Sequence, residues 1–85
     1  MHWHVYILRC SDNSLYTGLT NDLDARLAAH NAGKGAKYTA TRRPVSMVYH
    51  EPAESKNAAL KREIQIKRWP KAKKEAFIKE FRGRS

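Results

Sequence analysis

Five polar side chains lie in otherwise apolar parts of the sequence, and together they could carry out one reaction. They are Tyr6, Tyr16, Arg26, His30 and Glu63. A carboxylate supplies an oxygen ligand for a divalent cation, and a guanidinium can hold a phosphate group. A phenol or an imidazole can orient or deprotonate water. The set is therefore suited to chemistry at a phosphoryl centre.

Glu63 stands out because of its place in a predicted helix over 56–68. At about 100° per residue, Glu63 falls in an arc that also holds Ala59, Leu60, Ile64 and Ile66. A carboxylate that points toward the core must be paired, protonated or bound to a metal, because burying it bare is very costly. The alternative explanation is a structural ion pair with an inward Arg or Lys.

Arg26 and His30 show the same pattern in an earlier helix. They share an arc of roughly 100° with Leu23 and Leu27, so both are expected on the buried side, one turn apart. Taken singly, Arg26 could run along the edge of the core, and His30 could be a satisfied interior histidine. Both together with Glu63 indicate a site.

Two tyrosines complete the set. If a hairpin turn is centred on Asp12 and Asn13, Tyr6 and Tyr16 project from the same face of neighbouring strands. Gly18, two residues after Tyr16, removes a side chain where another group must approach the backbone. For each tyrosine alone, packing is the simpler role.

The apolar pattern predicts the first half of the fold. Residues 2–10 read as a strand with two apolar faces, which is typical of a central strand. Residues 15–19 form a hairpin with it. Thr20 or Asn21 is expected to cap a helix that ends near Asn31, with Gly33 as its terminator.

The second half begins with a basic, glycine-containing loop over 34–43. A strand over 45–50 and a helix over 56–68, capped by Ser55, are expected next. Pro70 breaks that helix and starts a last one that ends near Phe81. The order β-β-α-β-α-α predicts an α+β fold, a three-stranded antiparallel sheet flanked by helices, in a single domain over 1–85.

Charge indicates the class of partner. The 85 residues hold 17 Lys and Arg against 8 Asp and Glu, for a net charge of +9. So small and basic a chain is expected to bind a polyanion, most commonly nucleic acid; a merely soluble basic protein is the alternative. We expect phosphate contacts from the loop and the later helices, through Lys34, Lys37, Arg42, Arg43, Lys67 and Lys71.

Cysteine content and the N-terminus restrict the remaining classes. Cys10 is the only cysteine, so neither an internal disulfide nor a Cys-x-x-Cys zinc site is possible. No apolar run is long enough to cross a membrane, and the N-terminus lacks the order of a signal peptide. A cytoplasmic location is expected.

These residues, in this order, resemble the GIY-YIG nuclease superfamily. The two triplets that name the family appear here as His4-Val5-Tyr6 and Tyr16-Thr17-Gly18. The family's helical arginine falls on Arg26, its His or Tyr one turn later on His30, and its metal-binding glutamate on Glu63. The match covers nearly the whole chain and is similar to the small stand-alone bacterial members.

The sequence departs from the family pattern at three places. His4 replaces the usual Gly, and Thr17 replaces the common Ile or Val. Many active members also have an Asn about a dozen residues after the glutamate, whereas residues 69–76 contain Glu75 and no Asn.

The resemblance implies a divalent-metal-dependent endonuclease that hydrolyses DNA phosphodiester bonds, directed by structure rather than by sequence. It implies that Glu63 holds Mg²⁺ or Mn²⁺, that Arg26 stabilises the phosphoryl charge, and that Tyr16 is the base, oriented by Tyr6 and His30. His30 could be the base instead.

The DNA could be branched or single-stranded, and RNA stays open. One alternative is a non-catalytic basic DNA- or RNA-binding module of the same fold. Another is a subunit that needs a protein partner, docked through an exposed Trp69 and Phe81.

Overall fold

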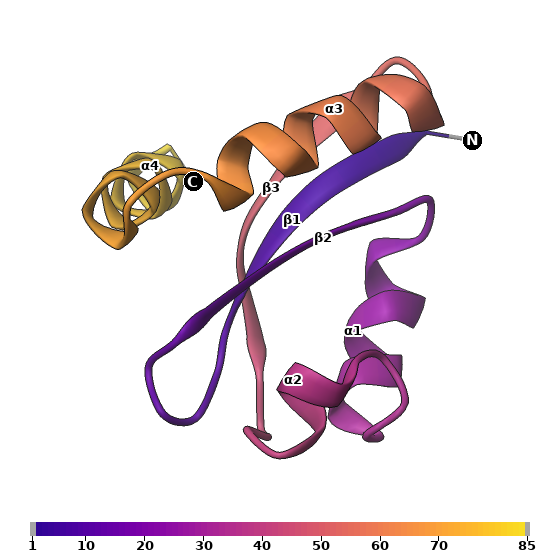
Figure 1. Cartoon of the computed structure of the whole chain (residues 1–85), viewed down its shortest axis with the longest axis vertical. Helices are drawn as coiled ribbons and strands as arrows, with labels where there is room; N and C mark the ends of the chain where they lie inside the picture. The colour runs from indigo at the N-terminus through magenta and orange to yellow at the C-terminus, as the bar shows by residue number, and fades with distance from the viewer. Residues whose placement is uncertain (1, 85) are drawn as a thin grey trace.

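A three-stranded antiparallel sheet of order β2-β1-β3 runs through the centre of the molecule (Figure 1). The computed structural model describes residues 2–84. Its elements are β1 (Trp3–Arg9), β2 (Leu15–Thr20), α1 (Leu23–Asn31), α2 (Lys37–Ala40), β3 (Ser46–Ala53), α3 (Lys56–Lys67) and α4 (Lys71–Gly83). The predicted fold class and the predicted order of elements are confirmed, except for the short helix α2 inside the expected loop.

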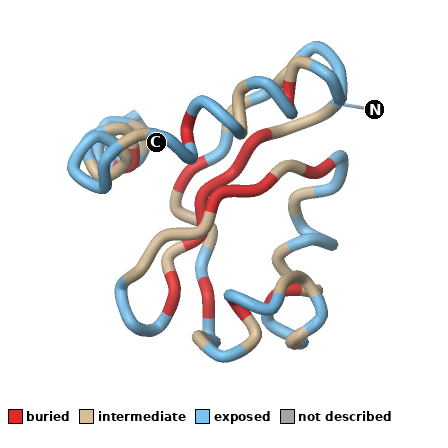
Figure 2. Tube along the Cα trace, viewed as in Figure 1, coloured by how far each residue is buried: buried red, intermediate tan, exposed pale blue. Residues whose placement is uncertain are grey.

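The central strand β1 is buried on both faces (Figure 2), as its apolar pattern predicts. Val5 and Ile7 point to the layer formed by α3 and α4. Tyr6 and Leu8 point to the opposite layer, which contains α1. Because successive side chains of a strand point to opposite faces, β1 contributes to both layers.

Side-chain capping explains where helices α1 and α3 begin. The Asp22 carboxylate accepts from the Ala25 backbone N–H at 3.1 Å, so Asp22 caps α1, and the expected cap at Thr20 or Asn21 is wrong. The Ser55 hydroxyl accepts from Ala58 N–H at 3.1 Å and caps α3 as expected.

The end of α1 is fastened to the start of β3. Gly33 follows the helix with φ of +80°, a left-handed conformation that favours glycine, and it terminates the helix as predicted. The Asn31 side chain then bonds the Val45 backbone twice, accepting at 2.8 Å and donating at 3.0 Å. Asn31 therefore closes the base of the segment over 32–44, which contains α2.

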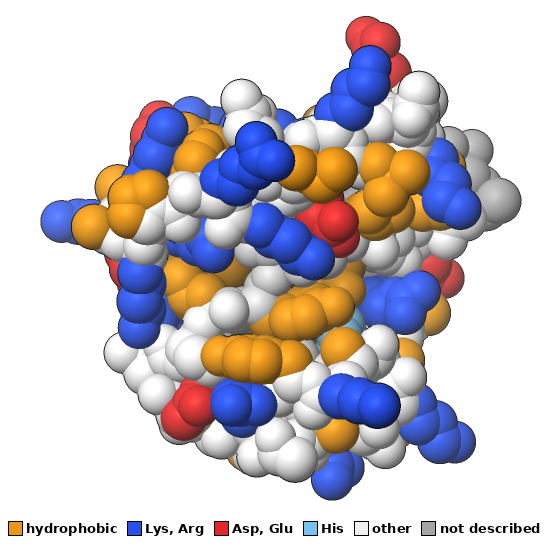
Figure 3. Space-filling model, viewed as in Figure 1, with side chains coloured by type: hydrophobic (Ala, Val, Ile, Leu, Met, Phe, Trp, Pro, Cys, Tyr) orange, Lys and Arg blue, Asp and Glu red, His pale blue; other side chains and the backbone are white. Residues whose placement is uncertain are grey.

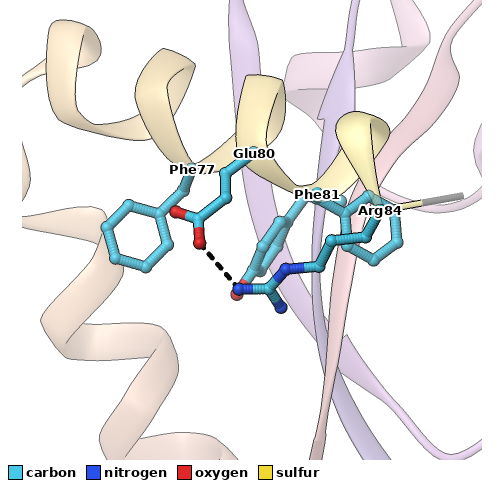
Figure 4. Close-up of a pocket in the computed structure, with 5 residues that line it drawn as sticks. Phe77, Glu80, Phe81 and Arg84 are labelled. Carbon is cyan, nitrogen blue, oxygen red and sulfur yellow. Dashed lines mark hydrogen bonds and ion pairs between the residues drawn. The ribbon is translucent and has the colours of Figure 1, made fainter.

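Helix α4 packs against the sheet through its aromatic residues. Phe77 and Phe81 extend from the same side of α4 (Figure 4), and their rings lie 6.3 and 5.2 Å from the ring of Tyr49. Trp69, just before α4, lies 4.4 Å from the ring of Phe77. Trp69 and Phe81 are half-buried against the core. The expectation that both side chains are exposed is therefore wrong.

The β1–β2 hairpin is tied to α4 by a forked ion pair. The Arg9 guanidinium donates to the two oxygens of Glu75 at 2.9 and 2.6 Å. Lys71 donates to the Asn13 carbonyl in the hairpin turn at 2.9 Å. Glu75, in the region where the family pattern has Asn, therefore makes a structural contact. Within residues 2–84, no helix is both long and apolar enough to span a membrane.

Candidate active site

Tyr6 lies against the backbone of the neighbouring strand at Gly18. The two residues are cross-strand partners on β1 and β2. A Cβ on Gly18 would lie 2.5 Å from the Tyr6 hydroxyl oxygen and 2.6 Å from Cζ, far inside contact distance. Glycine is therefore required at position 18 by the ring of Tyr6, as the sequence predicts.

A buried chain of hydrogen bonds runs from Tyr6 through His30. The Thr39 hydroxyl donates to the Ala36 carbonyl at 3.2 Å, so its oxygen can accept from His30 Nδ1 at 2.7 Å. With its proton on Nδ1, His30 accepts from the Tyr6 hydroxyl through Nε2 at 2.9 Å. Tyr6, His30 and Thr39 are all nearly inaccessible to solvent.

Gly35 makes room for the imidazole. A Cβ on Gly35 would overlap Nδ1 and Cγ of the His30 ring. The chain between α1 and α2 thus passes directly over the histidine. His30 is enclosed by its own helix, by Tyr6 and by this loop, which fixes the orientation of its ring.

Electrostatics keep both partners of this hydrogen bond neutral. Burial raises the pKa of the Tyr6 phenol well above its ordinary value, and Tyr16 adds to this effect. Burial lowers the pKa of His30 below its ordinary value of 6.5, and the positive charge of Arg26 lowers it further. Tyr6 is therefore a proton donor to a neutral imidazole near neutral pH.

Tyr16 lies beside this chain but outside it. Its ring is 5.2 Å from the ring of His30, in an edge contact, and the residue is half-buried. Among residues 2–84, no hydrogen bond engages its hydroxyl. Burial and then Glu63 raise the pKa of Tyr16, while Arg26 lowers it. Of the two tyrosines, Tyr16 is the one whose hydroxyl remains available to a substrate.

Arg26 is exposed on α1, which corrects the expectation that it lies on the buried side. The helix has only nine residues and buries one of them fully, His30. Arg26 lies at the rim of that narrow buried stripe. Its charge nonetheless influences the pKa values of Tyr6, Tyr16 and His30.

Glu63 lies at the margin of the buried face of α3, not at its middle. That face is centred on Ala59 and Ile66, which are fully buried, whereas Leu60 and Ile64 are 39% and 51% exposed. Leu60 and Ile64 are about 100° or more around the helix from Ala59, so a single packed stripe cannot include them. The predicted apolar arc therefore wrongly included Leu60 and Ile64 in the buried face.

The Glu63 carboxylate is mostly shielded from solvent yet only loosely paired. Its side chain is 16% exposed, and its one ion pair among residues 2–84 is with Lys67, at 3.8 Å. A structural ion pair, the alternative explanation for an inward carboxylate, predicts a closer contact. Glu63 raises the pKa of both Tyr6 and Tyr16, so the carboxylate lies near enough to act on both phenols.

These groups meet around the edge strand β2. Tyr6 and Tyr16 pack in the layer with α1, and Glu63 comes from α3 in the other layer. Figure 3 shows this face of the molecule. Exposed hydrophobic side chains lie between α3 and the α1–α2 segment, an acidic group lies above them, and Lys and Arg side chains surround both.

The donor set suits a hard divalent cation with many water ligands. Residues 2–84 contain no cluster of three or more His, Cys, Asp or Glu side chains placed to hold a metal. Glu63 would be the single protein ligand. Mg²⁺ commonly binds through one or two carboxylates and retains several waters, so the arrangement fits.

The structure divides the basic residues into two groups. Arg42 is paired with Asp12 at 3.1 Å, and Arg43 donates to the Ala40 carbonyl at 2.8 Å. With Lys71, they hold the fold together through at least one bond each. Lys34 and Lys37 are exposed and unpaired among the described residues. These two lysines are the loop cations most available to phosphate.

Sequence reasoning missed Thr39 and Gly35, which position His30, and Tyr38, whose ring stacks near Tyr16. All three lie in the segment expected to be a basic loop. The only sequence signal of this arrangement was Gly35 itself. Gly33 already terminates the helix, so a second glycine two residues later indicates another need for a small residue.

Comparison with known proteins identifies the family. The GIY-YIG catalytic domain matches residues 2–76. The UPF0213 protein SH2523 of Staphylococcus haemolyticus is 56% identical over 77 residues, covering 91% of this chain and 94% of that protein.

Two solution NMR structures are similar to this fold. The protein EF2693 from E. faecalis has 40% identity and a TM-score of 0.64, over 96% of this chain and 88% of that one. The UPF0213 protein BH0048 from Bacillus halodurans has 43% identity and a TM-score of 0.58, over 93% and 84%. The ordered tyrosine triplets, the helical Arg26 and Glu63 thus occur in a chain that belongs to the GIY-YIG catalytic domain family.

Proposed function

We propose that this protein is a metal-dependent endonuclease that hydrolyses phosphodiester bonds in DNA. The observation that carries the proposal is the place of Tyr16, whose hydroxyl makes no hydrogen bond among residues 2–84, on an edge strand between the layer of Arg26 and the layer of Glu63. Arg26 and Glu63 act on the pKa of Tyr16 from opposite sides of the edge strand. A phosphate held there would meet a cation, an oxygen donor for a metal, and an available hydroxyl.

Tyr16 is the general base in this proposal. His30 is a poor candidate because both of its nitrogens are engaged in buried hydrogen bonds. Tyr6 is a poor candidate because it is buried and its proton is donated to His30. Tyr16 can take a proton from water only as the phenolate. Burial and Glu63 oppose that form by raising the pKa of Tyr16, whereas Arg26 favours it by lowering the pKa.

Glu63 and Arg26 have the two remaining roles, metal binding and stabilisation of the phosphoryl charge. Glu63 would hold Mg²⁺ or Mn²⁺, which when bound supplies Lewis-acid stabilisation of the leaving oxygen. Arg26, exposed at the rim, would donate hydrogen bonds to the phosphoryl oxygens as their charge grows. The buried chain through Tyr6, His30 and Thr39 would position the strands that carry these groups.

Backbone contacts, rather than base reading, would place the substrate. Lys34 and Lys37 on the loop and Lys67 on α3 surround the site with positive charge. Such contacts give affinity without sequence information. We therefore infer that DNA structure, such as a branch or an unpaired strand, selects the cleavage point.

The test compares cleavage by the unaltered chain and by Glu63→Gln. Both are incubated with duplex, single-stranded, flap and junction DNAs, each with Mg²⁺, Mn²⁺ or EDTA. Cleavage should require metal and should disappear in Glu63→Gln, while binding in EDTA persists.

Glu54→Gln is the matched control, because Glu54 is an exposed carboxylate in the turn before α3. It should cut as the unaltered chain does. Cutting that survives Glu63→Gln would place the activity elsewhere. Binding to every substrate with cutting of none would support the non-catalytic module instead.

A further inference from the structure

A second aromatic ring extends the candidate site toward solvent. Tyr38, on α2, is 39% exposed and stacks with Tyr16 at 6.1 Å between centroids and 25° between planes. Rings this far apart are offset, so they overlap only in part. The exposed aromatic surface therefore continues outward from the phenol that we assign as the base.

Tyr38 is held in place by a network of its own. The Arg42 guanidinium lies 3.9 Å from the centre of the Tyr38 ring. Arg42 also donates to the Tyr38 carbonyl at 2.9 Å and to Asp12 at 3.1 Å. An exposed tyrosine that is anchored in this way loses little side-chain entropy when a ligand packs against it.

Both tyrosines line a surface pocket of about 240 Å³. Its lining consists of Leu15, Tyr16, Thr17, Tyr38, Lys67 and Lys74. One side is thus aromatic and aliphatic, and the other carries two ammonium groups from α3 and α4. Lys67 is also the partner of Glu63, so the pocket adjoins the proposed metal ligand.

Thr17 lines the pocket from the edge strand, but its side chain points to the opposite face of β2 from Tyr16. Thr17 is 3% exposed, and its hydroxyl has no hydrogen-bond partner among the described residues. A buried hydroxyl without a partner is unfavourable. This hydroxyl therefore bears on the stability of the fold rather than on contact with a ligand.

A planar group attached to a phosphate matches these features. An aromatic ring would pack against the two tyrosines, as bases do on single-strand-binding surfaces. The lysines would contact the adjoining phosphate. A base inside a duplex is already stacked and paired, so only an unpaired base could enter.

We propose that the Tyr16–Tyr38 pocket binds an unpaired nucleobase of the strand to be cut, next to the scissile phosphate. This inference rests on the proposed nuclease function only for the identity of the strand. It makes single-stranded or locally unpaired DNA the substrate class, and it makes Tyr38 a binding residue.

Base binding can be measured without cleavage. The probe is a single-stranded oligonucleotide that contains 2-aminopurine, mixed with the Glu63→Gln chain in EDTA. Stacking in the pocket should quench its fluorescence. Adding Tyr38→Ala should weaken binding about tenfold or more and relieve the quench, whereas adding Tyr38→Phe should preserve both. Affinity for a blunt duplex should change less than about twofold.

Two controls separate stacking from general effects. Adding Ile64→Ala removes another exposed apolar side chain, 51% exposed on α3, and should change neither signal. An oligonucleotide with abasic sites should bind the Tyr38-containing chain about tenfold more weakly than the normal oligonucleotide binds the same chain. This second control requires no further change to the protein, so it holds even if Tyr38→Ala folds poorly.

The two proposals fail separately. Equal losses on single-stranded and duplex DNA, or full affinity for the abasic strand, would overturn the nucleobase pocket. If those tests succeed but the unaltered chain cuts no DNA with any metal, the pocket stands and the nuclease function fails.

Discussion

The Tyr6 hydroxyl and Nε2 of His30 lie 2.9 Å apart in the interior, joined by a hydrogen bond between β1 and α1. The imidazole is held on its other side by Thr39. Tyr16, only 5.2 Å from the same ring, is not part of the chain. The two tyrosines of the site therefore have separable roles, one structural and one chemical.

Replacing each tyrosine by Phe should separate these roles. Tyr6→Phe leaves Nε2 of His30 buried without a partner and should lower the free energy of unfolding by about 1–3 kcal/mol. Tyr16→Phe removes a hydroxyl that bonds nothing among residues 2–84, so stability should hardly change while cleavage is lost. Urea denaturation and a nicking assay on both variants provide the check. Full activity in a stable Tyr16→Phe chain would rule out Tyr16 as the base.

Stability should depend on pH through His30. Its pKa is 6.5 when unfolded and lower in the folded state, so the unfolded chain binds more protons below that value. The free energy of unfolding should therefore be level above about pH 7 and should fall as pH drops below 6.5. NMR titration of the His30 ring gives the folded pKa directly. The pKa of His50 is also lowered by burial, so His50 could contribute to the same pH dependence. Repeating the denaturation with His50→Asn separates its contribution from that of His30. A His30 ring that titrates at or above 6.5 would contradict this account.

Adding a single methyl group to Gly18 should disturb the site. Gly18→Ala forces the Tyr6 ring away from the strand and should cost about 1–3 kcal/mol, as overpacking of a core does. Gly83→Ala is the control, because a Cβ there meets no atom within 4 Å. That change should be neutral or slightly stabilising, since alanine favours a helix. Thermal melts of both variants suffice, and equal melting temperatures would show that the ring can move without cost.

Removing the unused hydroxyl at position 17 should stabilise the protein. Thr17→Val keeps the shape of the side chain and removes a buried hydroxyl without a partner, so the free energy of unfolding should rise by about 1 kcal/mol. Thr20→Val is the counterpart, because the Thr20 hydroxyl bonds the Asp22 backbone at 3.0 and 3.2 Å. It should lower stability. A loss in both variants would mean that Thr17 makes a favourable contact in solution.

Local sequence patterns predicted the elements whose periodicity is strong. The two apolar faces of β1 identified the central strand, and Ser55 and Gly33 located two helix ends. Helix α2 could not be predicted, because four residues inside a polar loop have no measurable period. The cap at Asp22 was missed because Thr20, Asn21 and Asp22 are all good capping residues in sequence.

The sequence suggested a set of candidate site residues but not their arrangement, and it omitted Gly35, Tyr38 and Thr39. Glu63 was identified as an inward carboxylate, yet Leu60 and Ile64 proved exposed, so the reasoning overstated its burial. Arg26 proved exposed for a related reason, since helical angles alone do not give the width of the buried stripe. Thr39 bonds His30 from nine residues away, and no local pattern encodes such a contact.

The two hydrogen bonds between the Asn31 side chain and the Val45 backbone have a consequence for variation among related chains. They fasten both ends of the segment that bears Tyr38, so α1 and β3 keep their places whatever lies between. Insertions or replacements around Tyr38 that keep Gly35 and Thr39 in place beside His30 would alter the outer wall of the proposed pocket and leave Tyr16 and Glu63 undisturbed. Substrate choice could then change through one short stretch of chain, with the chemistry kept intact.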